Sequence, residues 1–190
     1  MDNNGSVLNA TIKDNLYIIH FSNTNMNQKK QVYKEKLTQV GYWNYDEVYI
    51  MLYNWLKDHG YKLSEGSYKE KLSGGGKEII ILWEATKKIT DYFQYKITLD
   101  WHILGMKDAE VEIDGKKTKT NKGELEIVFK GIIIKDYEKR WEDKPIYKFM
   151  RGLYEEYVIR KSVDEYEDDI EDQTKELILD LKAFLRIPVG

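Results

Sequence analysis

The stretch FQYKITLDWHI, residues 93–103, alternates strictly between large apolar and polar side chains. Successive side chains of a β-strand point to opposite faces of its sheet, so this period of two predicts a half-buried strand. We expect the face that runs from Phe93 to Ile103 through Tyr95, Ile97, Leu99 and Trp101 to be buried under helices. The opposite face carries Lys96, Thr98, Asp100 and His102, which we expect to meet water or a site.

The segments around this strand predict an antiparallel sheet. Short turns separate the predicted strands, and Asp114-Gly115 is a dipeptide that supplies the positive φ angles of a tight hairpin. Because these connections are too short for helical crossovers, neighbouring strands should be antiparallel. We expect about five or six strands over residues 61–134, with a bulge at Gly131. Besides 93–103, the predicted strands are 61–72, 77–88, 109–113, 116–120 and 124–134.

Three stretches with helical spacing of apolar residues flank the sheet. A helix over 45–59 is opened by a capping box at Asn44 and closed by Gly60. Two C-terminal helices are predicted over 146–160, after Pro145, and over 163–185, where Ser162 opens a second capping box. With all three packed on one face, the fold class is α+β in two layers.

The chain divides into a polar N-terminal part and a longer domain. Residues 1–30 are rich in Asn, Ser, Lys and Gln, and we expect a loosely ordered extension with one possible edge strand over 16–21. Residues 31–190 should form a single α+β domain with a substantial core. No apolar run is long enough for a transmembrane segment, and the start does not resemble an export signal.

Composition narrows the classes of function. The chain has no cysteine, which excludes thiol chemistry and disulfides and fits a cytoplasmic protein. Its net charge is −3 and only 4 of its 30 basic residues are arginine, which argues against nucleic acid as a partner. Three scattered histidines give no metal-ligand spacing, so we predict no metal and no cofactor.

The best candidates for acid and base catalysis are Lys96, Asp100 and His102, which share one face of the predicted strand 93–103. Histidine titrates near neutral pH and a carboxylate can fix its tautomer, so the group could transfer protons. A half-buried sheet also places polar residues on its solvated face without any catalysis. We favour that explanation, and enzymatic activity is left open with the balance against it.

Two charged stretches suggest ion contacts. Four lysines crowd one predicted hairpin and could contact phosphates or an anionic lipid surface, although a solvated hairpin tip explains them as well. An acidic run over residues 164–172 lacks the ligand spacing of a calcium loop and fits a solvated helix face. The candidate anion contacts are Lys116, Lys117, Lys119 and Lys122.

The aromatic content, with 15 tyrosines and 5 tryptophans, favours a binding role. We predict a non-catalytic binding or assembly module that contacts a protein partner, or another copy of itself, through an aromatic surface. The alternative is a small-ligand carrier or hydrolase whose pocket, between sheet and helices, would be lined by Trp83, Trp101 and Tyr154. The predicted partner-binding residues are Tyr42, Trp43, Tyr49, Ile50 and Tyr53.

Overall fold

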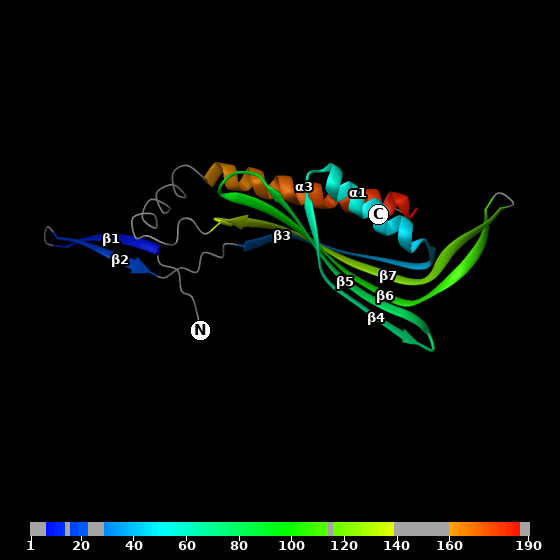
Figure 1. The fold of residues 1–190 in the computed structure, drawn as a ribbon. Helices are drawn as coiled ribbons and strands as arrows, with labels where there is room; N and C mark the ends of the chain where they lie inside the picture. Colours follow the sequence, from blue (N-terminus) through cyan, green and yellow to red (C-terminus); the bar gives the residue numbers. More distant parts are fainter. Residues whose placement is uncertain (1–6, 14–15, 23–28, 114–115, 139–159, 187–190) are drawn as a thin grey trace.

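The computed structural model describes residues 7–13, 16–22, 29–113, 116–138 and 160–186. Their strands are β1 (Val7–Lys13), β2 (Leu16–Ser22), β3 (Lys29–Trp43), β4 (Lys62–Ser73), β5 (Gly76–Lys88), β6 (Phe93–Ile113) and β7 (Lys116–Lys135). Their helices are α1 (Tyr45–Asp58) and α3 (Arg160–Phe184). In this part of the chain, an antiparallel sheet in the order β3-β7-β6-β5-β4 is covered on one face by both helices (Figure 1), so the α+β class is confirmed.

Strand β6 has the two faces that its alternation predicts. The inner face is buried, with Tyr95, Ile97 and Leu99 at 0% exposure. The outer polar residues are partly exposed, apart from Thr98, which is buried. The burial of the aromatic face under the helices is therefore confirmed.

The sheet differs from the prediction in how its strands end. Strand β6 continues to Ile113 and β7 runs unbroken from Lys116, so the interruptions predicted after 103 and after 120 are wrong. The pairing shifts register between Leu104 and Lys107, and Gly105 has a φ of +61°. This irregularity bends the pair without ending it, and the hairpin extends past the helices as an arm (Figure 1).

The sequence patterns did not predict β3, which forms one edge of the sheet beside β7. The segment predicted as a possible edge strand over 16–21 is a strand, β2, but it pairs with β1 in a two-stranded sheet and not at an edge of the five-stranded one. The division into an extension and a domain stays a prediction. Strand β4 forms the other edge of the five-stranded sheet.

Helix α1 begins and ends as its sequence predicts. The Asn44 side chain accepts a hydrogen bond from the Glu47 backbone N–H at 3.2 Å, which satisfies one of the free donors of the first turn. Gly60 follows the helix with a φ of +78°, a conformation that glycine adopts easily. The buried face of α1 packs on the sheet through Val48, Leu52, Trp55 and Leu56.

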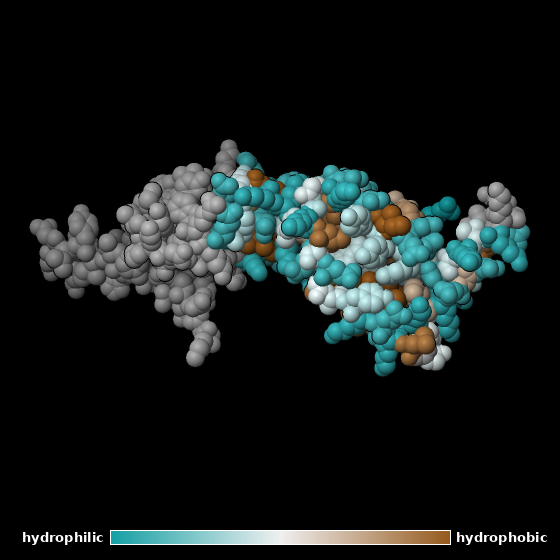
Figure 2. All heavy atoms as spheres, in the orientation of Figure 1, coloured by the Kyte–Doolittle hydropathy of each residue, from teal (hydrophilic) through white to brown (hydrophobic). Residues whose placement is uncertain are grey.

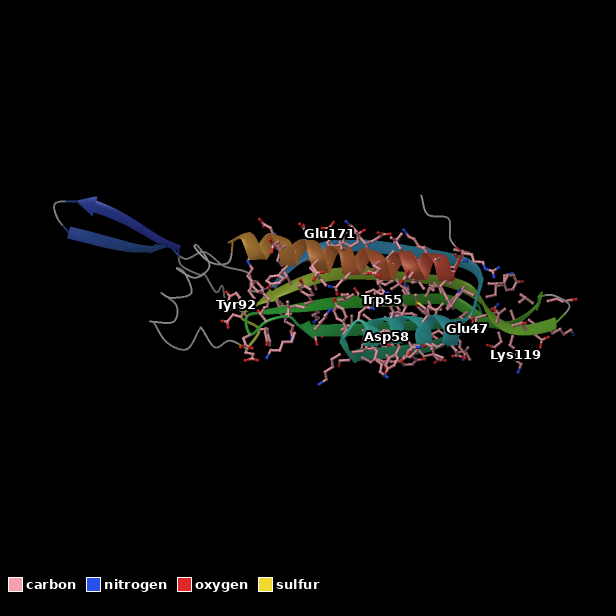
Figure 3. The ribbon with its side chains drawn as sticks, turned by 90° about the horizontal axis from the view of Figure 1, so that it is seen from above. Glu47, Trp55, Asp58, Tyr92, Lys119 and Glu171 are labelled. Carbon is pink, nitrogen blue, oxygen red and sulfur yellow. The ribbon has the colours of Figure 1, made fainter. Side chains whose placement is uncertain are left out.

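Helix α3 is longer at its start than predicted. It already includes Arg160, so the prediction that Ser162 caps it is wrong. Arginine and lysine at positions 160 and 161 are good helix formers, and the helix continues through the serine. The helix predicted over 146–160 lies outside the described residues except for its last residue. Seen from above, α1 and α3 lie side by side over the sheet, with Trp55 between them (Figure 3).

Candidate functional site

The structure separates the five residues predicted to bind a partner. Tyr42 is 54% exposed on the outer face of the sheet, whereas Trp43, the next residue of β3, points inward and is 4% exposed. On α1, Ile50 and Tyr53 are exposed at 56% and 42%. Tyr49 is only partly exposed because it packs against the core. The solvent-facing part of this set on the helical side of the sheet is thus Ile50 and Tyr53.

A cluster of tyrosines lies where α1 meets the edge strand β4. Tyr45, Tyr49 and Tyr53 follow one another at four-residue steps, which places them along one flank of the helix. On the β4 side of this flank are Glu65 and Tyr68, both exposed. We call these five residues the tyrosine cluster. Pale and brown atoms gather over α1 and β4 on the face drawn in Figure 2.

A β-bulge brings the two β4 residues of the cluster to the same face. Glu65 pairs with Trp83 and Tyr68 pairs with Ile81, both inward-facing residues of β5. The register shifts between Glu65 and Ser67, so Gly66 is the extra residue. Without it, Glu65 and Tyr68 would point to opposite faces, because side chains alternate along a regular strand.

The Glu65 carboxylate joins the cluster to the core. Its Oε2 accepts a hydrogen bond from Trp83 Nε1 at 3.2 Å. Tyr49 packs edge-on against Trp83, with ring centroids 4.7 Å apart, and lies 6.1 Å from Tyr45. Burial raises the pKa of Tyr49, and the charge of Glu65 and a hydrogen bond to it raise this pKa further. Glu65 is therefore held by an indole and a phenol.

The raised pKa of Tyr45 reflects mainly the burial of this side chain and only in part its charged neighbours. Burial raises it to about 12, with further contributions from Tyr68, Tyr49, Glu65 and Asp46. Each of these neighbours raises the pKa because a phenolate is disfavoured where negative charge already gathers. A cation placed beside the cluster would instead be favoured by the negative charges of Glu65 and Asp46.

Few basic groups offset this charge. Tyr68 donates a hydrogen bond to Glu70 at 2.7 Å, and Glu70 also lies 3.6 Å from the Lys77 ammonium. Glu65 and Asp46 form no ion pair with any described residue. The cluster thus combines exposed phenol rings with a carboxylate that has no basic partner in this part of the chain.

The interior beneath the cluster is packed with aromatic rings. Trp83 and Trp101 are 0% and 1% exposed and their ring centroids lie 5.2 Å apart. The indole N–H groups of Trp43 and Trp101 are buried and have no acceptor among the described residues. Tyr154, the third residue predicted to line a ligand pocket, lies outside the described residues.

The candidate catalytic residues do not converge. Lys96 bonds Glu84 at 2.5 Å, Asp100 bonds Lys130 at 2.5 Å, and His102 Nε2 lies 3.1 Å from Glu78. The side chains of His102 and Glu78 are 40% and 37% exposed. Each candidate has a different partner on an open face, so the arrangement gives no shared proton-transfer site.

Two of the four lysines of the β6–β7 arm lie opposite acidic residues. The strand register places Lys117 opposite Glu112 and Lys119 opposite Glu110. Lys122 lies over the Tyr42 ring, 5.3 Å from its centroid. The side chain of Lys116 is outside the described part. Opposite charges across a hairpin stabilise it, and they leave less basic potential for an anion.

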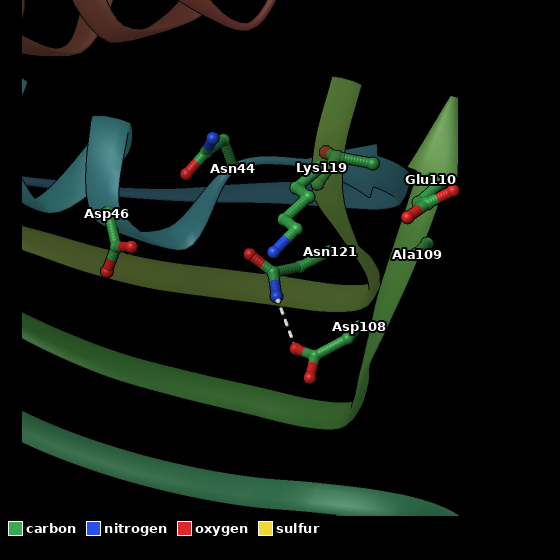
Figure 4. A pocket seen from close by; sticks show the side chains of 8 residues that line it. Asn44, Asp46, Asp108, Ala109, Glu110, Lys119 and Asn121 are labelled. Atoms are coloured by element: carbon green, nitrogen blue, oxygen red, sulfur yellow. Dashed lines mark hydrogen bonds between the residues drawn. The ribbon is translucent and has the colours of Figure 1, made fainter. Parts of the chain in front are cut away.

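An open polar hollow of about 590 Å³ lies between the arm and the start of α1 (Figure 4). In it, the Asn121 amide donates to Asp108 at 3.4 Å, while its oxygen accepts the Tyr45 backbone N–H at 3.0 Å. The hydrogen bonds of Asn121 therefore connect the arm to the start of α1. It is lined by Asn44, Asp46, Asp108, Ala109, Glu110, Lys119, Thr120 and Asn121.

The acidic run of α3 takes part in packing. Asp169 accepts a hydrogen bond from the Tyr95 hydroxyl at 2.9 Å, and Glu167 pairs with Lys30 at 2.6 Å.

In the described ranges, no three His, Asp or Glu side chains gather as metal ligands. Nor is any helix there both long and apolar enough to cross a membrane. In comparisons with protein-family models, curated proteins and solved structures, nothing matches this chain.

Proposed function

We propose that this domain is a non-catalytic binding or assembly module, which contacts a protein partner or another copy of itself. One observation carries the proposal: exposed aromatic and apolar side chains lie on α1 and on the neighbouring edge strand β4. Such residues are enriched in the central part of protein interfaces. They are Ile50 at 56% exposure, Tyr53 at 42%, Tyr68 at 47% and Leu72 at 76%.

The edge of β4 is less suited to contact by strand addition. Lys69 and Lys71 lie on this strand, and its pairing is interrupted by the bulge at Gly66. Lysines and bulges are devices that keep a sheet edge from pairing with another chain. We therefore place the contact on the side chains of α1 and β4. Nucleic acid stays disfavoured, and the cytoplasm stays the predicted location.

A matched pair of substitutions tests this proposal. Tyr53→Lys and Ile80→Lys each place a lysine at a residue that is 42% exposed, the first on α1 and the second on the outer face of the sheet. Self-association is measured by sedimentation velocity. Binding to a partner is measured by chemical cross-linking of the folded protein to that partner. We expect Tyr53→Lys alone to abolish the association. If both variants associate like the unchanged protein, the contact is elsewhere and the proposal is wrong.

A small-ligand carrier or hydrolase is the second candidate. The buried indole N–H groups of Trp43 and Trp101 favour it, because a ligand between sheet and helices could accept hydrogen bonds from them. The packing of Trp83 against Trp101 favours the binding module instead. A ligand in this place would shift the Trp101 indole signal in NMR spectra, whereas a surface partner would leave it in place.

A further inference from the structure

We infer that the tyrosine cluster recognises an arginine side chain in a basic segment of the partner protein. The inference rests on the proposed function and names the chemistry of the contact. It follows from the combination, at one exposed place, of phenol rings and a carboxylate without a basic partner in the described chain.

The phenol rings provide the first part of the recognition. Tyr53 and Tyr68 present rings that are 42% and 47% exposed, whereas the neighbouring rings of Tyr45 and Tyr49 are partly buried against the core. The face of an aromatic ring is negative and attracts a cation within about 6 Å of its centroid. Arginine suits such a surface better than lysine, because its planar guanidinium stacks on rings and is more weakly hydrated.

The Glu65 carboxylate provides the second part. Oε2 already accepts from Trp83, and the carboxylate has further lone pairs for the N–H groups of a guanidinium. Because the indole and the Tyr49 hydroxyl hold the group, little side-chain freedom would be lost on binding. A stacked guanidinium could therefore also donate to Glu65.

Charge complementarity decides the class of occupant. Asp46 adds negative charge near Tyr45, and Glu70 is the acid that Lys77 offsets. An acidic or phosphorylated segment would be repelled here, and a purely apolar one would leave the charge of Glu65 without a basic partner.

The test titrates N-acetyl-arginine amide into the full chain and follows the Trp83 indole N–H signal by NMR, assigned with Trp83→Phe. This signal reports on Glu65 directly, because the two groups are hydrogen-bonded. N-acetyl-citrulline amide, of similar shape but uncharged, is the control ligand. We expect a saturable shift with the arginine compound alone. An equal shift with citrulline, or none with either compound, would overturn the inference.

Two isosteric variants locate the effect. Glu65→Gln keeps an acceptor for the indole and removes the charge, so we expect it to weaken arginine binding about fivefold. Glu78→Gln makes the same change on the outer face and should leave binding unaltered. Equal binding by Glu65→Gln and the unchanged protein would refute the role of Glu65. If partner association is lost in Tyr53→Lys but the arginine compound does not bind, this inference alone fails.

Discussion

Replacement of Gly131 by alanine tests how closely α3 packs on the sheet. A Cβ at Gly131 would lie 2.6 Å from Thr174 Oγ1 and 3.4 Å from the Ile170 carbonyl oxygen. The hydroxyl cannot easily yield, since Thr174 is fully buried and donates to that carbonyl at 2.7 Å. The helix or the strand must shift instead. Overpacking of this kind costs about 1–3 kcal/mol, and we expect Gly131→Ala to lower the free energy of unfolding by about 2 kcal/mol.

A double-mutant cycle in urea, followed by tryptophan fluorescence, measures this contact. Thr174→Ala removes the hydroxyl and leaves the Cβ of residue 174 at 3.5 Å and the Ile170 carbonyl oxygen at 3.4 Å, both ordinary contact distances. In that background Gly131→Ala should cost less than half as much, which gives a coupling energy of about 1–2 kcal/mol. Gly74→Ala is the control, because a Cβ there meets nothing within 4 Å. A Gly131→Ala cost equal to that of the control, or unaffected by Thr174→Ala, would refute the close packing.

Two further predictions concern ion pairs. Burial opposes ionisation of Glu35, but hydrogen bonds from Lys182 and Tyr33 outweigh it and lower the pKa of the carboxyl. The ionised Glu35 carboxylate therefore contributes its full stability above the pKa that it has in the unfolded chain, and this contribution is lost as the pH falls through the pKa of the folded protein. Glu35→Gln should thus flatten the acid side of a curve of unfolding free energy against pH. An unchanged curve would contradict this prediction. His102→Ala breaks a half-exposed pair with Glu78 and should change the free energy of unfolding by less than about 0.5 kcal/mol in urea, whereas a loss above 1 kcal/mol would reveal a structural role.

Local patterns predicted the elements whose stability is decided locally. The alternation over 93–103 sets the two faces of β6, and Asn44 and Gly60 mark the ends of α1. Each of these signals depends on neighbours within a few residues, so tertiary contacts did not need to be known. The sheet order β3-β7-β6-β5-β4 is different, because it depends on where distant segments pair.

Strand β3 escaped prediction because its inner face is only partly apolar. Leu37 and Trp43 are buried there, but Glu35 occupies an inner position and bonds Lys182 of α3 at 2.8 Å. Tyr33, two residues away, also donates to Glu35, but the basic side chain that pairs with it is 147 residues away, so no local pattern predicts the ion pair. Because this strand was not predicted, the alternation of its side chains was not predicted either. Trp43 points inward and Tyr42 outward, whereas both were assigned to one surface.

The tyrosine cluster was half predictable for a related reason. The spacing of Tyr49 and Tyr53 on α1 is visible in the sequence, and both were predicted as contacts. The contribution of β4 depends on the bulge at Gly66, which reverses the alternation so that Glu65 and Tyr68 share a face. The segment 61–72 has few apolar residues to reveal such a reversal, and a glycine within a strand is compatible with a regular position as well as a bulge. A single inserted residue therefore places the carboxylate among the phenols, and that placement turns an aromatic surface into one suited to a cation.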